Sequence, residues 1–210
     1  MKRQVIIVLA VCVLIGSAGA VFSQDNSFGL RVGLDLWRVT ESGGAEDWQP
    51  KFTPGFSFGF FGENVLAPIF SIQTEITFLF SRGKLVDPAD EDTYVELREF
   101  MGDVAFIPKF FFALDEGIDY FVYIAPSVGF GIIPSERATF SSEPEPGNWE
   151  ELVVENWRYK ANFSVLFGMG IEVHGFFLDI RYSLGLINRN EQAGITRKAS
   201  RLMFATGYKF

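Results

Sequence analysis

The chain has 210 residues, of which 18 are Lys or Arg and 26 are Asp or Glu, so its formal net charge is −8. This acidic balance argues against nucleic-acid binding, which needs a basic surface that neutralises phosphates. Cys12 is the only cysteine, and it lies in a segment that we expect to be removed, which excludes disulfides and cysteine chemistry from the mature protein.

Residues 1–20 have the order of a secretory signal peptide. Lys2 and Arg3 form a positive start, an apolar run of eleven residues covers 5–15, and small residues follow. The run is too short for a transmembrane helix, which needs about 20 residues. We expect cleavage after Ala20 or after Ser23, and a single barrel domain over residues 21–210. Without Lys2 and Arg3, the remaining 16 basic and 26 acidic residues leave a net charge of −10.

Apolar residues alternate with polar or small ones along most of the remaining chain. A period of two is typical of strands, whereas a helix would place apolar residues three and four apart. The alternation predicts eight strands, near residues 28–38, 52–63, 69–82, 95–113, 119–133, 157–173, 175–187 and 200–210. Strands of this length suit a membrane barrel, in which a tilted strand needs about 9–11 residues, better than a soluble sandwich with strands of about 5–6 residues.

The connections between these strands alternate in length. Short joins fall at 64–68, 114–118 and the pair His174-Gly175, and long ones at 39–51, 83–94, 134–156 and 188–199. Outer-membrane barrels have short periplasmic turns and long extracellular loops. The sequence therefore predicts an all-β fold, an eight-stranded antiparallel up-and-down transmembrane β-barrel in a bacterial outer membrane, with both termini periplasmic. The long loops hold acidic groups such as 87–92 and 143–155, where we expect an extracellular ligand to bind.

One face of each predicted strand is apolar, and we expect it to contact outer-membrane lipid. Phe56, Phe58 and Phe60 are examples on the second strand. Aromatic residues also fall near the predicted strand ends, where amphipathic rings prefer the membrane interface. They are Tyr94, Trp157 and Tyr159 at the outer ends and Tyr120, Tyr208 and Phe210 at the inner ends.

The opposite face of the strands carries seven basic and seven acidic residues. We expect them to form a charge network that fills the lumen, because an eight-stranded barrel is only wide enough for its own side chains and buried charges must be paired. The alternative is a narrow pore or ligand site, since inward glycines such as Gly29, Gly33, Gly168 and Gly170 leave space. The fourteen charged residues are Arg31, Asp35, Glu63, Glu75, Glu99, Asp103, Lys109, Arg158, Lys160, Glu172, Asp179, Arg181, Arg201 and Lys209.

Four blocks resemble the PorT-type family of outer-membrane β-barrels. They are Tyr94–Phe112, Tyr123–Phe130, Leu178–Leu186, with its Arg-Tyr-x-x-Gly-Leu run, and the ending Gly207–Phe210. The resemblance implies the barrel fold and the outer-membrane location, and it adds an accessory part in secretion or envelope assembly as a further alternative. Tyr208 and Phe210 also resemble the final-strand signal that the barrel-assembly machinery reads, which would make that machinery a partner during biogenesis.

The sequence offers little for catalysis. His174, the only histidine, is expected in a periplasmic turn, away from any extracellular nucleophile that it would have to activate. Glu99 and Asp103 are interpreted as partners of Lys109 rather than as an acid pair. We therefore expect no enzyme, catalytic residue, cofactor or metal. The predicted function is that of a closed or very narrow barrel that acts structurally or through its acidic loops, and the alternative is a porin-like channel or carrier for small solutes.

Overall fold

The structure, a computed structural model, describes residues 26–42, 49–86, 94–115, 117–139, 162–188 and 196–210. The predicted signal peptide and the central parts of the four long loops lie outside these ranges. Within them, no helix has the length and apolar character that crossing a membrane requires. The strands are β1 (Asn26–Ser42), β2 (Gln49–Lys51), β3 (Thr53–Ala67), β4 (Phe70–Val86), β5 (Tyr94–Asp115), β6 (Ile118–Thr139), β7 (Asn162–Val173), β8 (Phe176–Gly185) and β9 (Thr196–Lys209).

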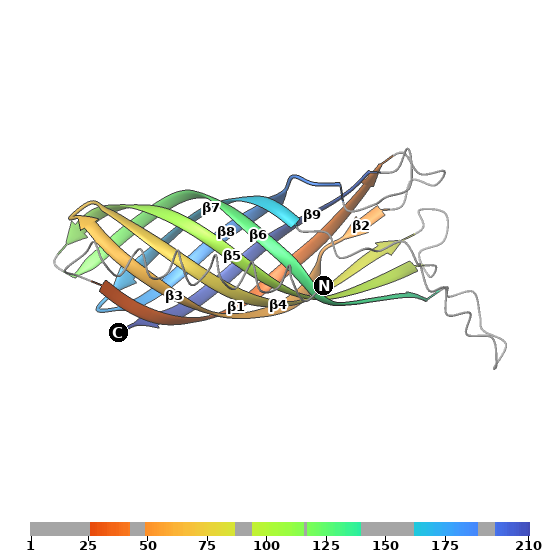
Figure 1. The fold of residues 1–210 in the computed structure, drawn as a ribbon, viewed down its shortest axis with the longest axis horizontal. Coiled ribbons are helices and arrows are strands. Elements are labelled where there is room, and N and C mark those ends of the chain that lie inside the picture. The colour runs from red at the N-terminus through yellow and green to blue at the C-terminus, as the bar shows by residue number, and fades with distance from the viewer. Residues whose placement is uncertain (1–25, 43–48, 87–93, 116, 140–161, 189–195) are drawn as a thin grey trace, which may run out of the picture.

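The strands form a closed antiparallel barrel, which confirms the predicted fold (Figure 1). Each long strand pairs with its neighbour in the chain, and β1 pairs with β9 to close the wall. The short β2 continues β3 and pairs with β4. Gln49 lies opposite Val86 whereas Phe56 lies opposite Phe80, so the register shifts by one residue between β2 and β3. The described part of the wall therefore has eight strands, with β2 as an extension of β3.

The stagger of the strands fixes the width of the barrel. The register, followed once around the wall from Gly29, returns to β1 at Val39, ten residues further along. With ordinary strand spacing and rise, a ten-residue stagger over eight strands gives a tilt of about 40° and a radius of about 8 Å. That lumen holds side chains and little else. The path runs through Gly29, Phe61, Glu75, Ala105, Ser127, Ser164, Gly185, Ala199 and Val39.

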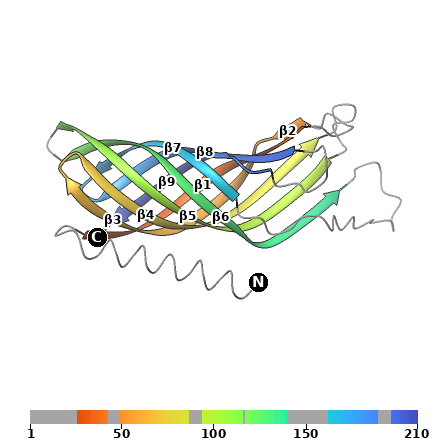
Figure 2. The ribbon, with the colours of Figure 1, turned by 45° about the horizontal axis from the view of Figure 1, so that its top comes forward.

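The short connections gather at one end of the barrel, together with Phe210 (Figure 1), and a second view agrees (Figure 2). The tight turn predicted at His174-Gly175 is confirmed. Both residues have positive φ angles, 49° and 84°, which is the requirement of a type I′ hairpin turn. The backbone N–H of Phe210 donates to the carbonyl of Phe28 at 2.8 Å. We call this end the short-turn end and the opposite one the long-loop end.

β1, β4, β5, β6 and β9 run further towards the long-loop end than the alternation predicts, whereas β8 ends at Gly185, before its predicted end at 187. The predicted loops 39–51, 83–94, 134–156 and 188–199 each lose residues to a neighbouring strand, and β5 and β6 reach 22 residues each. β4, β5 and β6 project furthest in both views. The predicted boundaries are wrong there because backbone pairing continues beyond the last apolar residue, and the ladder needs no alternation of side chains.

Burial follows the period of two. Inward residues are buried, including many charged ones, whereas large apolar side chains of the outward face are exposed, such as Leu34 at 65% and Ile124 at 63%. A water-soluble protein buries most of its large apolar side chains, so the described part of the barrel has the reverse arrangement. The polarity of this interior positions the candidate site.

Candidate functional site in the barrel lumen

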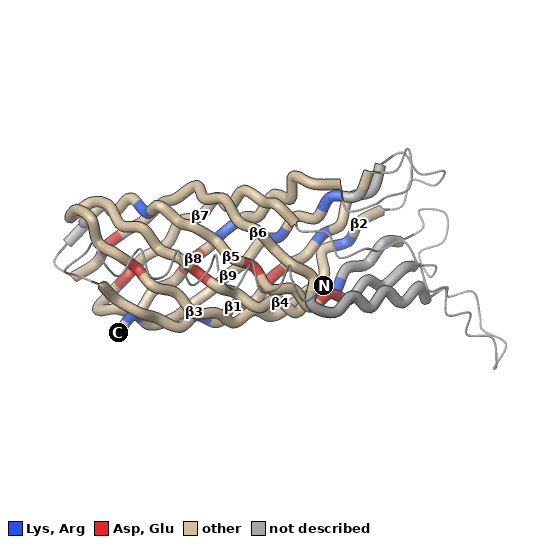
Figure 3. Tube along the Cα trace, in the orientation of Figure 1, with Lys and Arg blue, Asp and Glu red and all other residues tan. Residues whose placement is uncertain are grey.

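Charged positions of both signs recur along the barrel (Figure 3), and their side chains meet in the lumen in three layers. The short-turn layer is Glu63, Lys109, Glu172 and Lys209. The central layer is Arg31, Glu75, Asp179 and Arg181. The long-loop layer is Asp35, Glu99 and Arg201.

Glu75 is the centre of the central layer. Its Oε2 accepts from Arg31 Nη1 at 2.6 Å, and its Oε1 accepts from Arg181 Nη1 at 2.8 Å. The Gln73 amide and the Thr77 hydroxyl donate to the same carboxylate at 2.9 and 2.5 Å. Both oxygens are thus saturated by donors, and the charge is fully buried, with 1% of the side chain exposed. A carboxylate in this setting is held by charge-assisted hydrogen bonds, which are the strong ones.

Asp179 completes the central layer. It accepts from Arg181 Nη2 at 2.6 Å and lies 3.4 Å from Arg31 Nη2. The Tyr123 hydroxyl donates to Asp179 Oδ1 at 2.9 Å. Two arginines therefore face two carboxylates, and the layer is neutral, as burial in a low dielectric requires.

The central layer crosses the lumen. Glu75 lies on β4 and Arg181 on β8, and four strand steps separate β4 from β8 in either direction around the wall. These two strands are diametrically opposite, so the Glu75–Arg181 pair joins opposite walls. Arg31 reaches the pair from β1 and Tyr123 approaches from β6. The layer is a cross-brace that occupies the barrel axis.

The short-turn layer combines two lysines with two glutamates. Glu63 Oε2 lies 3.6 Å from Lys109 Nζ and 3.5 Å from Lys209 Nζ, and Lys209 also pairs with Glu172. The Ser71 hydroxyl donates to Glu63 as well. The last strand is thereby tied to β3 and β7, and this layer is neutral too.

Aromatic rings surround the Lys109 ammonium. Its Nζ lies 4.7 Å from the ring centroid of Phe121, 5.8 Å from that of Phe61 and 5.9 Å from that of Phe177. A cation within about 6 Å of a ring face is attracted by the ring quadrupole. The rings belong to a buried apolar cluster that fills the short-turn half of the lumen.

The inward glycines do not leave the lumen open. A Cβ on Gly29 would lie 2.1 Å from the Phe61 ring, and one on Gly168 would lie 2.0 Å from the Tyr123 ring. Gly170 is covered by Phe121 in the same way, at 2.3 Å. The expectation of free space at these glycines is wrong, because a ring from a neighbouring strand lies over each of them.

The long-loop layer has more negative than positive charge among the described residues. Arg201 Nη2 pairs with Glu99 at 3.0 Å, and Arg201 Nε lies 3.9 Å from Asp35 Oδ2. The Ser81 hydroxyl donates to Asp35 Oδ2 at 2.9 Å, and the Arg201 guanidinium lies over the Trp37 ring at 5.6 Å. Among the described residues, Asp35 and Glu99 thus both contact Arg201.

The structure pairs most of the residues predicted for the network. Asp103 faces the lumen but forms no ion pair with a described residue, and Arg158 and Lys160 lie outside the described ranges. Gln73, Thr77, Ser81 and Tyr123 were missed because they are uncharged, although the alternation alone places them on the inward face. Among the residues described, no cluster of histidine, cysteine or carboxylate side chains could hold a metal ion. The predicted residues that are paired are Arg31, Asp35, Glu63, Glu75, Glu99, Lys109, Glu172, Asp179, Arg181, Arg201 and Lys209.

The fold and the lumen define the chain as a closed eight-stranded antiparallel β-barrel with a filled, charged interior. Solved structures to which it is similar include the attachment invasion locus protein Ail of Yersinia pestis, with 12% identity over 89% of this chain and 100% of that one and a TM-score of 0.41. Neisserial surface protein A matches with 12% identity over the same shares and a TM-score of 0.46. The N-terminal barrel domain of Pseudomonas aeruginosa OprF matches with 8% identity over 86% and 97% and a TM-score of 0.34.

No family model and no curated protein sequence matches the chain. The resemblance to the PorT type therefore stays a prediction. The assignment of the fold rests on the strand register of this chain.

Proposed function

We propose that the protein is an outer-membrane barrel whose lumen is closed and which acts through its outer wall and its long-loop end. The observation that carries the closed lumen is the Glu75–Arg181 pair, which joins opposite walls on the barrel axis. Location, closure and surface role are supported by separate features of the molecule.

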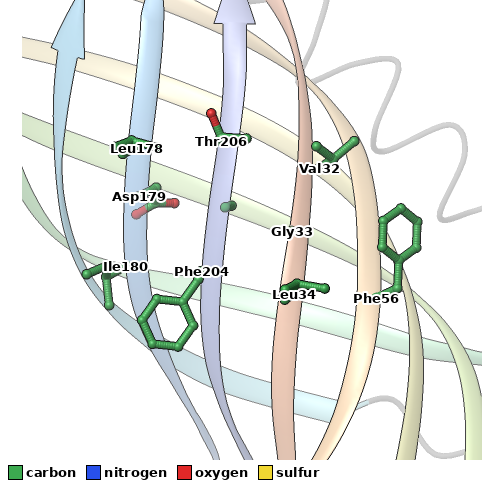
Figure 4. A pocket seen from close by; sticks show the side chains of 10 residues that line it. Val32, Gly33, Leu34, Phe56, Leu178, Asp179, Ile180, Phe204 and Thr206 are labelled. Atoms are coloured by element: carbon green, nitrogen blue, oxygen red, sulfur yellow. The ribbon is translucent and has the colours of Figure 1, made fainter.

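The membrane location is supported by the outer wall, whose exposed side chains are apolar over most of its height. A shallow groove of about 540 Å³ over β9 and its neighbours shows this character (Figure 4). The polar side chain among its outward lining residues, Thr206, donates its hydroxyl to the carbonyl of Phe177 at 2.9 Å. The groove therefore presents carbon to its surroundings, as a wall solvated by lipid chains would.

The aromatic residues of the short-turn end also support a membrane. Tyr120, Tyr208 and Phe210 are exposed there at 42%, 37% and 67%, together with Phe112 and Phe176. Aromatic girdles of this kind border an apolar band about 25 Å tall in outer-membrane barrels. Tyr94, Trp157 and Tyr159, predicted for the other girdle, have no described side chains.

Closure is supported by two successive barriers. The central layer offers no unpaired charge that could bind a permeating ion, and the aromatic cluster beyond it fills the short-turn half with Phe61, Phe121 and Phe177. Moving an ion through would require breaking buried ion pairs, each of which costs about 3–5 kcal/mol to break. A surface role follows, since the outer wall and the long-loop end remain accessible.

Conductance of the refolded protein in planar bilayers tests the closed lumen. We expect no steady conductance from the native barrel. A variant with Phe121→Ala and Phe177→Ala together with Glu75→Gln should conduct, because both barriers are then removed. The matched control, Phe112→Ala with Phe176→Ala, truncates two outward rings and should stay silent. Discrete, reproducible channels from the native protein would overturn the proposal.

A further inference from the structure

The charges of the described barrel are sorted by sign between its two faces. All eight acidic residues with described side chains occupy inward positions. The basic residues divide, and four of them, Arg38, Lys51, Arg82 and Lys198, are on the outer face. The acidic eight are Asp35, Glu63, Glu75, Glu99, Asp103, Asp119, Glu172 and Asp179. In the described part, a protein with a net charge of −8 thus carries only positive charge on its outer wall.

The four outward basic residues lie on neighbouring strands, which run in the order β9, β1, β3 with its extension β2, and β4. Lys198 on β9 pairs with Thr40 on β1, and Arg38 on β1 pairs with Ser200 on β9. Lys51 on β2 pairs with position 84 of β4, two residues beyond Arg82. The four residues therefore lie close together in the register, and we call Arg38, Lys51, Arg82 and Lys198 the basic collar.

The collar lies at one height on the barrel. We take a rise of about 3.3 Å per residue, a strand spacing of about 4.8 Å and a tilt of about 40°. The register then puts the Cα atoms of Arg38, Arg82 and Lys198 within about 2 Å of a common level along the barrel axis. The Cα atom of Lys51 lies within about 5 Å of that level. Arg82 is the next outward residue after the exposed Phe80. The collar thus begins where the apolar wall ends, at the long-loop end.

The collar is free of acidic partners within the described structure. None of its four members has a described carboxylate within ion-pair distance. The Arg38 guanidinium lies 5.4 Å from the centroid of the exposed Phe52 ring, and the Arg38 Nε atom itself is buried. In the lumen, by contrast, the charged groups are mostly paired. Among the described residues, therefore, no carboxylate competes with an external anion for the collar.

We propose that the basic collar binds lipids whose headgroups carry phosphate, in the membrane leaflet at the long-loop end. This inference rests on the proposed membrane location and is independent of whether the lumen conducts. Phosphate groups of lipids lie just beyond the hydrocarbon band, which is the level of the collar. Guanidinium groups bind phosphate with two parallel hydrogen bonds, and each basic residue near an anionic membrane surface strengthens the attraction about fivefold. The collar would fix the barrel's depth and gather such lipids around β9, β1 and β4.

The test is a binding titration of the refolded full-length barrel in a zwitterionic detergent with fluorescent lipid A, followed by anisotropy. The variant Arg38→Gln with Arg82→Gln and Lys198→Gln removes three positive charges and should weaken binding about 100-fold. The matched control, Thr40→Gln with Ser200→Gln, changes uncharged neighbours at the same height and should leave binding within about twofold of native. Inorganic phosphate, added as a competitor, distinguishes a lipid-binding site from a site for the free phosphate ion. Millimolar phosphate should displace the fluorescent lipid A only if the site binds the free ion.

Equal affinity of the native barrel and the triple variant would overturn the proposal, as would complete competition by inorganic phosphate. If the triple variant does not fold, as judged by its heat-modifiable gel shift, the salt dependence of the native barrel decides. Binding through the collar must weaken as salt rises, because exposed charges are screened beyond about 10 Å at 0.1 M salt, and salt-independent binding contradicts it. The two proposals fail in different ways. If the native barrel does not conduct in planar bilayers and does not bind lipid A, only the lipid-binding role of the collar is refuted. If the native barrel conducts and binds lipid A, only the closed lumen is refuted.

Discussion

Replacing Glu75 by glutamine removes the negative charge at the centre of the barrel. In the native lumen, Glu75 accepts from Arg31 through one oxygen and from Arg181 through both, at 2.6 to 3.1 Å. A glutamine at this position turns its NH₂ group towards an arginine whichever way the amide is oriented. The variant also leaves two buried arginines with Asp179 as their remaining carboxylate in the central layer.

The expected loss of stability is large. Removing one partner of a buried, hydrogen-bonded ion pair costs about 3–5 kcal/mol, because the other charge stays buried without compensation. We expect Glu75→Gln to lower the free energy of unfolding by that amount. Thr77→Val removes a neutral donor from the same carboxylate and should cost about 1 kcal/mol, the usual value for such a hydrogen bond.

Urea unfolding of the refolded barrel in lipid vesicles, followed by tryptophan fluorescence, measures these differences. Asp103→Asn is the matched control, since it makes the same change at a lumen carboxylate that forms no ion pair with a described residue, and it should stay within about 1 kcal/mol of native. Glu75→Gln with Arg31→Gln restores a neutral layer of Arg181 and Asp179 and should recover much of the lost stability. A loss below about 1 kcal/mol for Glu75→Gln, or a double variant less stable than the single one, would refute the cross-brace.

Two further predictions concern glycine positions and a turn. Gly168→Ala should destabilise the barrel by about 1–3 kcal/mol, because its Cβ would lie 2.0 Å from the Tyr123 ring. Gly62→Ala should not destabilise it, because the new Cβ would have no atom within 4 Å beyond those of its chain neighbours. Equal unfolding midpoints for the two variants would contradict the filled lumen. His174→Asn should raise the free energy of unfolding by about 1 kcal/mol, since Asn tolerates the left-handed φ of 49° better and Asn-Gly is the preferred type I′ pair; an unchanged or lower urea midpoint would show that the turn is not strained.

The alternation of the sequence was enough to determine the fold. A period of two requires that apolar and polar residues face opposite sides, and strands with an apolar face and no helix to cover it must close into a barrel or aggregate. The same pattern identified which charges face inward, since the face of a residue in a strand depends only on its parity. The tight turn at His174-Gly175 was also local, because Gly in that position favours a primed turn.

The strand ends and the pairing of the charges were decided by the tertiary structure. The alternation weakens beyond the apolar wall, so the sequence gives no signal for the upper parts of β5 and β6, which backbone pairing alone extends. The parity of Glu75 and Arg181 places both in the lumen, but only the ten-residue stagger brings these residues, which are 106 positions apart, to the same level on opposite walls.

The glycines illustrate the same division. The sequence shows small inward residues at Gly29 and Gly168 and predicts space, but the register places Phe61 and Tyr123 over them and fills it. The sign of the outer wall is likewise invisible in a net charge of −8, because the acidic residues with described side chains all face the lumen. By itself the sequence determined which face of the wall each side chain occupies. The closure and stagger of the barrel determined which side chains meet. They set the level of each residue along the barrel axis and the strand that faces it across the lumen.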